Sequence, residues 1–141
     1  MAATPDTKTL SLEYDFPHPP AKVWRALTER DLLAKWLMSN DMNATVGASF
    51  TFSMKPVGGW DGIVRGEVLE SEPPKRLRYT WRSAGVDTVV TWTLSATSEG
   101  GTKLSLEQSG VPANAQAFEG ARYGWQRMAG KQLGEVLATL A

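Results

Sequence analysis

The sequence predicts an α+β fold in which a curved antiparallel sheet of about six strands is wrapped around a long C-terminal helix. Three observations predict this fold. One strand-like segment precedes two short helical segments, several strand-like segments with short turns follow, and the chain ends in a long amphipathic segment. Strands joined by short turns pair antiparallel, whereas parallel strands need long crossover connections. A helix with one apolar stripe has to bury it, so the sheet is expected to cover that stripe.

The first elements are predicted to be a strand and two short helices. Apolar residues alternate with polar residues along the strand, at Leu10, Leu12, Tyr14 and Phe16. The strand should end at Pro17, and the proline pair that follows favours a helix start because proline presets a helical φ. Thr28 and Asp31 have the spacing of a capping box, with Asp in place of the usual Glu or Gln. They predict a second helix that runs through Trp36.

Five further strands are expected between residues 45 and 108. The clearest alternation of apolar and polar residues is at Val46, Ala48, Phe50, Phe52 and Met54. A glycine-rich loop, residues 58–62, separates this strand from the next, which runs from Ile63 to about Glu70. After a turn at Pro73-Pro74, the alternating positions of the last three strands are Leu77, Tyr79 and Trp81, then Thr88, Val90, Trp92 and Leu94, and finally Leu104, Leu106 and Gln108.

A long helix is expected near the C-terminus, with Asn114 as its N-cap. At about 100° per residue its apolar residues fall on one side, at Phe118, Ala121, Trp125, Met128, Ala129, Leu133, Val136, Leu137 and Leu140. The other side or its edge carries glycines, at Gly120, Gly124, Gly130 and Gly134. Each glycine weakens an isolated helix by about 0.8–1 kcal/mol, so the helix should depend on docking its aromatic stripe onto the sheet.

Composition and charge exclude several classes of function. The chain has 141 residues, which predicts a single domain, residues 1–141, with a structured core of about residues 8–140. Its 15 basic and 15 acidic residues balance, so no overall field attracts nucleic acid or anionic lipid. Without cysteine and with one histidine, the chain is expected to carry no metal site, cofactor or His-based triad. That histidine, His18, is predicted to be a turn residue and not a general base.

The sequence also gives an expectation about location. The N-terminus lacks the positive region and apolar stretch of a signal peptide. No apolar run approaches the roughly 20 residues that a membrane helix needs. We therefore expect a cytoplasmic protein with no membrane partner.

The aromatic content indicates a candidate ligand site. The chain contains six tryptophans, three tyrosines and four phenylalanines. Rings at this density either fill a core or line a pocket between the sheet and the helix. The expected lining of such an apolar cavity is Trp36, Phe50, Phe52, Tyr79, Trp81, Trp92, Leu106, Phe118, Trp125 and Met128. A completely filled core is the alternative for the same residues.

Polar side chains in this apolar setting are candidates for orienting a ligand. Arg122 and Gln132 fall within the stripe of the last helix, and Gln108 lies on the apolar face of its strand. A buried guanidinium or amide needs a partner, for which Glu67 is a candidate, or else a water or a ligand atom. The alternative for Arg122 is a stem on apolar surface with its head in water.

Two features are expected at the surface. Trp60, in the glycine-rich loop, is a candidate lid, and the alternative is a ring that folds back onto the domain. A second feature is a basic strand face opposite the alternating aromatic residues, at Arg76, Arg78 and Arg82. A platform for single-stranded nucleic acid needs aromatic and basic groups on one face, so none is predicted. A solvated outer face is expected, which also suits an acidic partner.

Several segments occur in a characteristic order: residues 16–28 (FPHPPAKVWRALT), 33–36 (LAKW), 66–70 (GEVLE) with Pro73-Pro74, 77–81 (LRYTW), 102–110 (TKLSLEQSG) and Gly124-Trp125. Together they resemble the family named after activators of the heat-shock protein 90 ATPase, in the START-like, birch-pollen-allergen-like superfamily (SRPBCC). The resemblance runs from about residue 10 to residue 140. It implies the helix-grip fold, with a cavity between sheet and helix. Superfamily members share a cavity and no fixed catalytic set, so no catalytic residue is carried over.

The resulting functional prediction is a protein that binds a small apolar or aromatic molecule in a central hydrophobic cavity. Aromatic faces would supply affinity, and Arg122, Gln108 and Gln132 would orient the ligand. The alternative is a co-chaperone-like interaction module that acts on a chaperone or another protein through the basic strand or the Trp60 loop. A third class is a cavity enzyme, such as a hydrolase or cyclase, that uses Glu67, Arg122 or a tyrosine.

Overall fold

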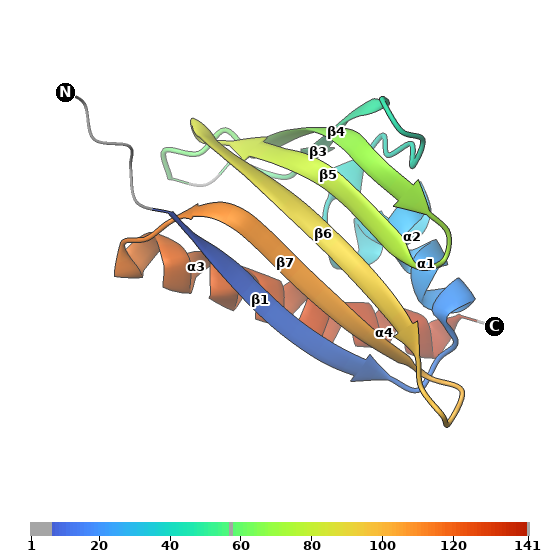
Figure 1. Cartoon of the computed structure of the whole chain (residues 1–141). Helices are drawn as coiled ribbons and strands as arrows, with labels where there is room; N and C mark the ends of the chain where they lie inside the picture. Colours follow the sequence, from blue (N-terminus) through green and yellow to red (C-terminus); the bar gives the residue numbers. More distant parts are fainter. Residues whose placement is uncertain (1–6, 57, 141) are drawn as a thin grey trace.

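The computed structural model describes residues 7–56 and 58–140 and shows a curved antiparallel sheet of seven strands around the C-terminal helices (Figure 1). The elements in chain order are β1 (Thr7–Phe16), α1 (Pro20–Thr28), α2 (Arg30–Trp36), β2 (Ser39–Asn40), β3 (Ser49–Ser53), β4 (Ile63–Glu72), β5 (Arg76–Ser83), β6 (Val86–Ala96), β7 (Thr102–Pro112), α3 (Ala115–Arg127), the π-helical turn η1 (Met128–Gln132) and α4 (Leu133–Thr139). The predicted α+β helix-grip fold, with two short helices after the first strand, is confirmed.

The strands lie in the order β1-β7-β6-β5-β4-β3-β2, and every neighbouring pair is antiparallel. Strands β2 to β7 pair in chain order, and the last strand, β7, also pairs with the first strand, β1. The register sets Tyr79, Val90 and Gln108 directly opposite one another on β5, β6 and β7. Opposite residues share a face of the sheet, and all three are buried, so this row lies on the inner face toward the helices.

The sheet has one strand more than the sequence predicts. The added strand, β2, consists of two residues that pair with β3 through Ser39–Ser53 and Asn40–Phe52. Two residues are too few to show an alternating pattern, which is why the sequence does not reveal it. Strand β3 is also shorter than expected, because Val46 and Met54 lie outside it and are 61% and 46% exposed.

The predicted capping box at the second helix is wrong. Thr28 still belongs to α1, and its hydroxyl donates to the carbonyl of Trp24 at 2.9 Å. A threonine inside a helix commonly bonds the carbonyl four residues earlier, which removes it as a cap. The N-cap of α2 is Glu29, and its side chain makes no capping hydrogen bond.

The C-terminal helix confirms its predicted cap and stripe but is not continuous. Asn114 Oδ1 accepts a hydrogen bond from the backbone nitrogen of Ala117 at 2.9 Å. Trp125, Ala129, Leu133 and the rest of the stripe face the sheet, either buried or packed against the core. The sequence predicts one helix, whereas the structure inserts the π turn η1 between α3 and α4. Such turns shift the register of a helix by one residue, so α3 and α4 each keep their apolar residues toward the core.

Two glycines of this helix have a packing role that the sequence does not show. A Cβ on Gly130 would lie 3.0 Å from Cε1 of Tyr14, and one on Gly134 would lie 3.5 Å from Cε1 of Phe16. Both aromatic rings belong to β1. The absent side chains therefore let the helix approach the edge strand closely, which offsets their cost in helix propensity.

The helices that pack at the two ends of the helix–sheet interface differ. In Figure 1, α1 and α2 lie at the end occupied by α4, while α3 lies at the end of the β5–β6 turn. Helices α1 and α2 pack against α4, whereas α3 packs against β7 and β1. Among the described residues, the short helices therefore pack mainly at the α4 end of the core, whereas the Trp60 loop lies against the end of β5 through Ser83.

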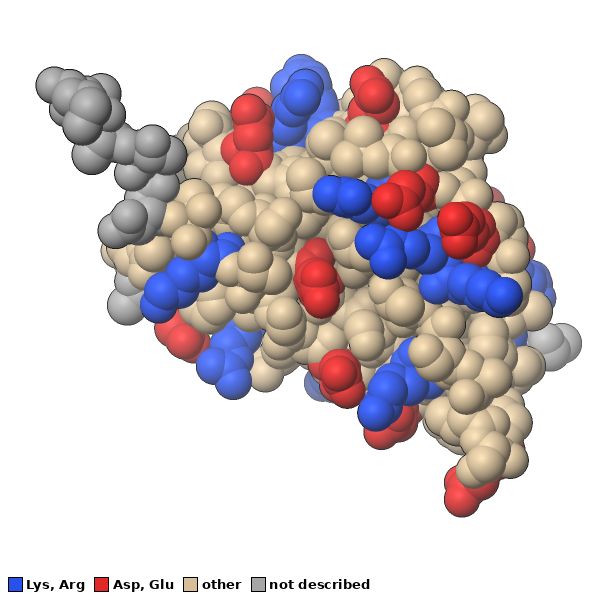
Figure 2. Space-filling view, in the orientation of Figure 1, with Lys and Arg blue, Asp and Glu red and all other residues tan. Residues whose placement is uncertain are grey.

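The outer face of the sheet carries charges of both signs. Figure 2 shows basic and acidic side chains side by side over β4 and β5. Arg76 Nε lies 2.8 Å from Glu70 Oε2, and Arg78 Nη1 lies 3.3 Å from Glu70 Oε1. Arg82 Nε lies 3.6 Å from Asp87 Oδ1. The arginines thus occupy the outer face, as expected, and acidic neighbours balance much of their charge.

Candidate ligand-binding site

A continuous network of aromatic rings fills the inner face of the sheet. Ring centroids are 5.9 Å apart for Trp36 and Trp92, 5.5 Å for Trp92 and Trp125, and 5.1 Å for Trp125 and Trp81. The same network continues through further predicted lining residues, namely Phe52, Phe50 and Tyr79. Tilted and edge-to-face contacts at these distances are favourable for aromatic pairs. The structure therefore brings together the aromatic residues that β3, β5, β6, α2 and α3 contribute.

Burial along the C-terminal helix is uneven. Ala129, Leu133 and Leu137 are fully buried, in η1 and α4. In α3, by contrast, Trp125 is buried, while Phe118 and Ala121 are half-buried. Further half-buried residues of the core are Leu12, Tyr14, Trp81 and Met128. Phe118 and Ala121 are therefore less buried than Ala129, Leu133 and Leu137 farther along the helix.

A chain of buried hydrogen bonds crosses the interior beneath α3. The Trp125 indole nitrogen donates to Gln108 Oε1 at 2.8 Å, and Gln108 Nε2 donates to Thr88 Oγ1 at 3.0 Å. The Thr88 hydroxyl donates in turn to the carbonyl of Trp81 at 2.9 Å. Gln108 and Thr88 are each 6% exposed. Buried polar groups need such partners, so this chain fixes the positions of α3 and the sheet relative to each other.

Thr88 is the member of this chain that the sequence analysis did not single out. The alternation of the strand could have identified it, because Thr88 occupies the same face as the apolar residues Val90, Trp92 and Leu94. An inward polar residue on an apolar strand face indicates a buried hydrogen bond. Its partner Gln108 lies 20 residues away, on a different strand, so the sequence alone does not identify the pair.

A second buried hydrogen bond joins Trp92 and Tyr79. The Trp92 indole nitrogen donates to the Tyr79 hydroxyl oxygen at 2.9 Å. Burial raises the pKa of Tyr79 far above its ordinary value, because the phenolate would lose its hydration. Tyr79 is therefore a neutral phenol inside the aromatic network, unsuited to act as a general base.

Three of the predicted polar residues do not join the interior. Arg122 is exposed, and its Nη1 lies 3.7 Å from Glu119 Oε1 on the same helix. Glu67 is exposed on β4, so it does not meet the buried amide of Gln108. Gln132 is half-buried and borders a separate surface hollow with Lys35 and Glu135. The expected orienting role of Arg122 and Gln132 thus has no support from their positions.

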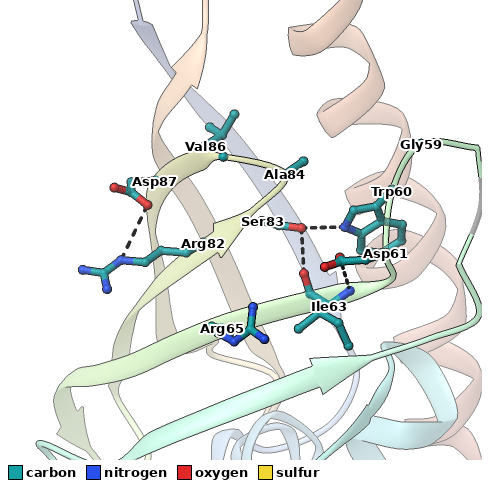
Figure 3. Close-up of a pocket in the computed structure, with 11 residues that line it drawn as sticks. Gly59, Trp60, Asp61, Ile63, Arg65, Arg82, Ser83, Ala84, Val86 and Asp87 are labelled. Carbon is teal, nitrogen blue, oxygen red and sulfur yellow. Dashed lines mark hydrogen bonds and ion pairs between the residues drawn. The ribbon is translucent and has the colours of Figure 1, made fainter.

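Trp60 lies at the rim of a surface hollow of about 410 Å³ (Figure 3). Its indole nitrogen donates to Ser83 Oγ at 2.7 Å, and the same hydroxyl donates to the carbonyl of Ile63 at 2.9 Å. The half-buried ring packs against the core, as the alternative to a lid predicts. A lid role for Trp60 would require this hydrogen bond to open.

Four charged and exposed residues also line this hollow. Arg65 and Arg82 stand directly opposite each other on β4 and β5, and Asp61 and Asp87 border the same space. In the view of Figure 3, Arg65 lies below the Arg82–Asp87 and Trp60–Ser83 pairs, on the strand that carries Ile63. Two basic and two acidic groups balance, so the hollow is polar and nearly neutral. It does not resemble the apolar site that the aromatic content predicts.

His18 lies in the turn between β1 and α1. Its Nδ1 is 3.1 Å from Lys22 Nζ, and its carbonyl accepts a hydrogen bond from the Thr102 hydroxyl at 2.7 Å. Partial burial and the positive charge of Lys22 lower the pKa of the imidazole. Within residues 7–56 and 58–140, no group of three His, Asp or Glu side chains is arranged to hold a metal ion. No helix in these same ranges is long and apolar enough to cross a membrane.

Comparisons with known proteins agree with this architecture. The profile of the family "Activator of Hsp90 ATPase homolog 1-like protein" matches residues 17–138. The chain is similar to the crystal structure of protein MLL2253 from Mesorhizobium loti, with 38% identity, a TM-score of 0.84 and coverage of 95% of this chain and 99% of that chain. For protein CV1439 from Chromobacterium violaceum, the identity is 33%, the TM-score 0.77 and the coverage 92% and 96%.

A third similar structure is DynU16, described as a protein in the dynemicin biosynthetic locus. Its identity is 27%, its TM-score is 0.80, and the match covers 93% of this chain. The match spans 47% of DynU16, so it concerns about half of that protein. The comparison with curated proteins gives no match.

Proposed function

The chain belongs to the family of activator of Hsp90 ATPase homolog 1-like proteins, and from that premise we propose that it binds a small apolar or aromatic molecule between the sheet and α3. The uneven burial of apolar residues along the C-terminal helix carries this proposal. Leu133 and Leu137 of α4 are fully buried, while Phe118 and Ala121 of α3 are half-buried. Apolar surface left partly open beneath one helix is the place where a ligand adds the most burial.

The chemistry of the surrounding residues supports an aromatic ligand. Trp81 and Trp125 lie in ring contact, and Phe118 and Met128 are half-buried apolar residues packed against the same core. Flat rings and a thioether provide tilted and edge contacts to another aromatic ring. The setting of DynU16 in a biosynthetic locus is also consistent with a small-molecule ligand for this kind of domain.

The family name supports a second candidate, an interaction with a chaperone or another protein. The outer face of the sheet has little net positive charge for such a partner to bind, because Glu70 pairs with both Arg76 and Arg78. An acidic partner would have to displace Glu70, so its binding would weaken steeply with salt and with Arg76→Glu. Binding that ignores salt would argue against this candidate.

The mass of the natively folded protein, purified without organic solvent, tests the primary proposal. A native mass above the denatured mass would reveal a retained small molecule and support it. A bare native mass, combined with no binding of any neutral aromatic probe, would reject it. The same spectrum shows whether the chain forms oligomers.

A further inference from the structure

The interior beneath α3 contains no buried charge. Among the described residues, the buried polar or charged side chains are Thr88, Thr102 and Gln108, and none of them is ionised. The two arginines of α3, Arg122 and Arg127, are exposed, and Arg122 pairs with Glu119. The exposed ammonium of Lys8 lies 5.6 Å from the centroid of the Phe118 ring, but it is not buried. A ligand carboxylate or ammonium next to Gln108 would lose its hydration and find no buried opposite charge, which costs several kcal/mol. The interior therefore favours an electrically neutral ligand.

The hydrogen bonds of Gln108 determine which end of its amide is the nitrogen. The Trp125 indole nitrogen can only donate, so the atom that it meets is Oε1. The Thr88 hydroxyl already donates to the carbonyl of Trp81, so it accepts from Nε2. The amide orientation is thus set by the network itself.

Gln108 has one hydrogen-bond donor left over. An amide NH₂ group carries two hydrogens, and Thr88 takes one of them. Within the described part of the chain, no acceptor meets the second hydrogen. Because Gln108 is 6% exposed, solvent reaches this hydrogen poorly. A buried donor without an acceptor is rare and unfavourable, more so than an unused lone pair on an oxygen.

Two tyrosine hydroxyls in the interior also have unused hydrogen-bonding capacity. The Tyr79 hydroxyl accepts from Trp92, and its own hydrogen meets no acceptor among the described residues. The Tyr14 hydroxyl is buried and has no hydrogen-bond partner in the same part of the chain. Gln108 and Tyr79 thus each have a buried hydrogen that only an acceptor can satisfy, while the Tyr14 hydroxyl can still both donate and accept.

From these observations, and resting on the proposed function, we infer that the ligand is a neutral aromatic molecule that presents an accepting oxygen, such as a ketone carbonyl, to Gln108. Its ring lies beneath α3 against Phe118, Met128 and Trp81, and its oxygen accepts the second hydrogen of Gln108 Nε2. Thr88 is then a positioning residue, because it holds the amide in the orientation that leaves this hydrogen directed to the ligand.

Three molecules of nearly equal shape test this inference on the unmodified protein. Acetophenone carries a carbonyl oxygen, α-methylstyrene replaces that oxygen by a methylene group, and benzoate is a carboxylate at neutral pH. Their binding is followed by nuclear magnetic resonance of the six tryptophan indole N–H groups. One net hydrogen bond should make acetophenone bind about two- to tenfold more tightly than α-methylstyrene. Benzoate should bind at least about 100-fold more weakly than acetophenone.

The possible outcomes separate this inference from the proposed function. If α-methylstyrene or benzoate binds as tightly as acetophenone and shifts the Trp125 signal, the site exists but the inference about Gln108 is wrong. If none of the three shifts any indole signal, both the inference and the proposed site are rejected. An anionic molecule found in the native mass spectrum would likewise contradict the inference that the ligand is electrically neutral.

A matched pair of variants assigns the preference to Gln108. Gln108→Met keeps the length of the side chain and removes its donor, so acetophenone should lose its advantage over α-methylstyrene to within about twofold. Gln126→Met makes the same chemical change at an exposed position of α3 and should leave the preference intact. A preference that survives Gln108→Met would contradict the assignment. Should Gln108→Met unfold, the comparison of the three probes on the unmodified protein still decides.

Discussion

The Trp125 indole nitrogen donates to Gln108 Oε1 across 2.8 Å, so a side chain of α3 is hydrogen-bonded to the inner face of the sheet. Gln108 in turn reaches Thr88 on β6. Trp125 is 3% exposed and Gln108 6%, which excludes most competing water. At the end of the molecule that lacks a covering short helix, this bond contributes to holding α3 in place.

Loss of the Gln108 amide should destabilise the fold. In Gln108→Met, the Trp125 N–H remains buried without an acceptor, so the free energy of unfolding should fall by about 1–3 kcal/mol. Trp125→Phe removes the other partner of the hydrogen bond. The double variant should lose about 1 kcal/mol less unfolding free energy than the sum of the losses in the two single variants. Urea unfolding of the four proteins measures this coupling. Additive effects would show that the bond contributes little.

Ala121 offers a test of whether space exists beneath α3. In Ala121→Trp, the new ring should enter the proposed site, keep the free energy of unfolding within about 1 kcal/mol and abolish acetophenone binding. In a filled core the same ring would cost about 1–3 kcal/mol through overpacking. Gln126→Trp places the ring on the exposed side of α3 and serves as the control. Thermal unfolding and probe titration together distinguish the two cases.

The glycines of the C-terminal helix should respond differently to alanine. A Cβ on Gly120 meets nothing within 4 Å, so Gly120→Ala should raise the free energy of unfolding by about 0.5–1 kcal/mol. A Cβ on Gly130 would lie 3.0 Å from the Tyr14 ring, so Gly130→Ala should lose that gain or destabilise. Denaturant midpoints of the two variants provide the comparison. Equal stabilisation would mean that α3–η1 does not need its close approach to β1.

Tyr79 should make stability depend on alkaline pH. Burial raises its pKa in the folded protein above the ordinary value of about 10, so the folded state holds the proton more tightly than the unfolded state. The stabilisation is complete below about pH 10 and decreases as the pH rises toward the folded-state pKa. The free energy of unfolding should therefore fall above pH 10, and less steeply in Tyr79→Phe. Tyr14→Phe, at a half-buried phenol whose pKa burial also raises, should have a smaller effect.

Local periodicity accounts for the parts of the fold that were predictable. Side chains alternate along Leu104, Leu106 and Gln108, and the structure places all three on the inner face of β7. Alternation reports a strand because its period of two is a property of the backbone and needs no distant contact. The same reasoning explains why β2 and the π turn were not predicted, since neither is long enough to carry a period.

The candidate site was predictable in composition but not in arrangement. The aromatic residues of the expected lining do lie together, because the apolar sides of strand and helix have one interior in which to be buried. Arg122 shows the limit of this reasoning. A helical wheel places it within the apolar stripe, yet its side chain is exposed, so its charge reaches water and Glu119.

By itself the sequence determined the order of strands and helices, the helix-grip fold with its family, and the inward side of most elements. The element order and the inward sides follow from local spacing and turn residues, and the helix-grip fold and the family follow from the resemblance of the segments in residues 16–125. The tertiary structure alone decided that Thr88, Gln108 and Trp125 form one chain, because its links join residues 20 and 17 positions apart on three elements. It also decided that Phe118 and Ala121 of α3 are less buried than Leu133 and Leu137 of α4, because α1 and α2 pack against α4.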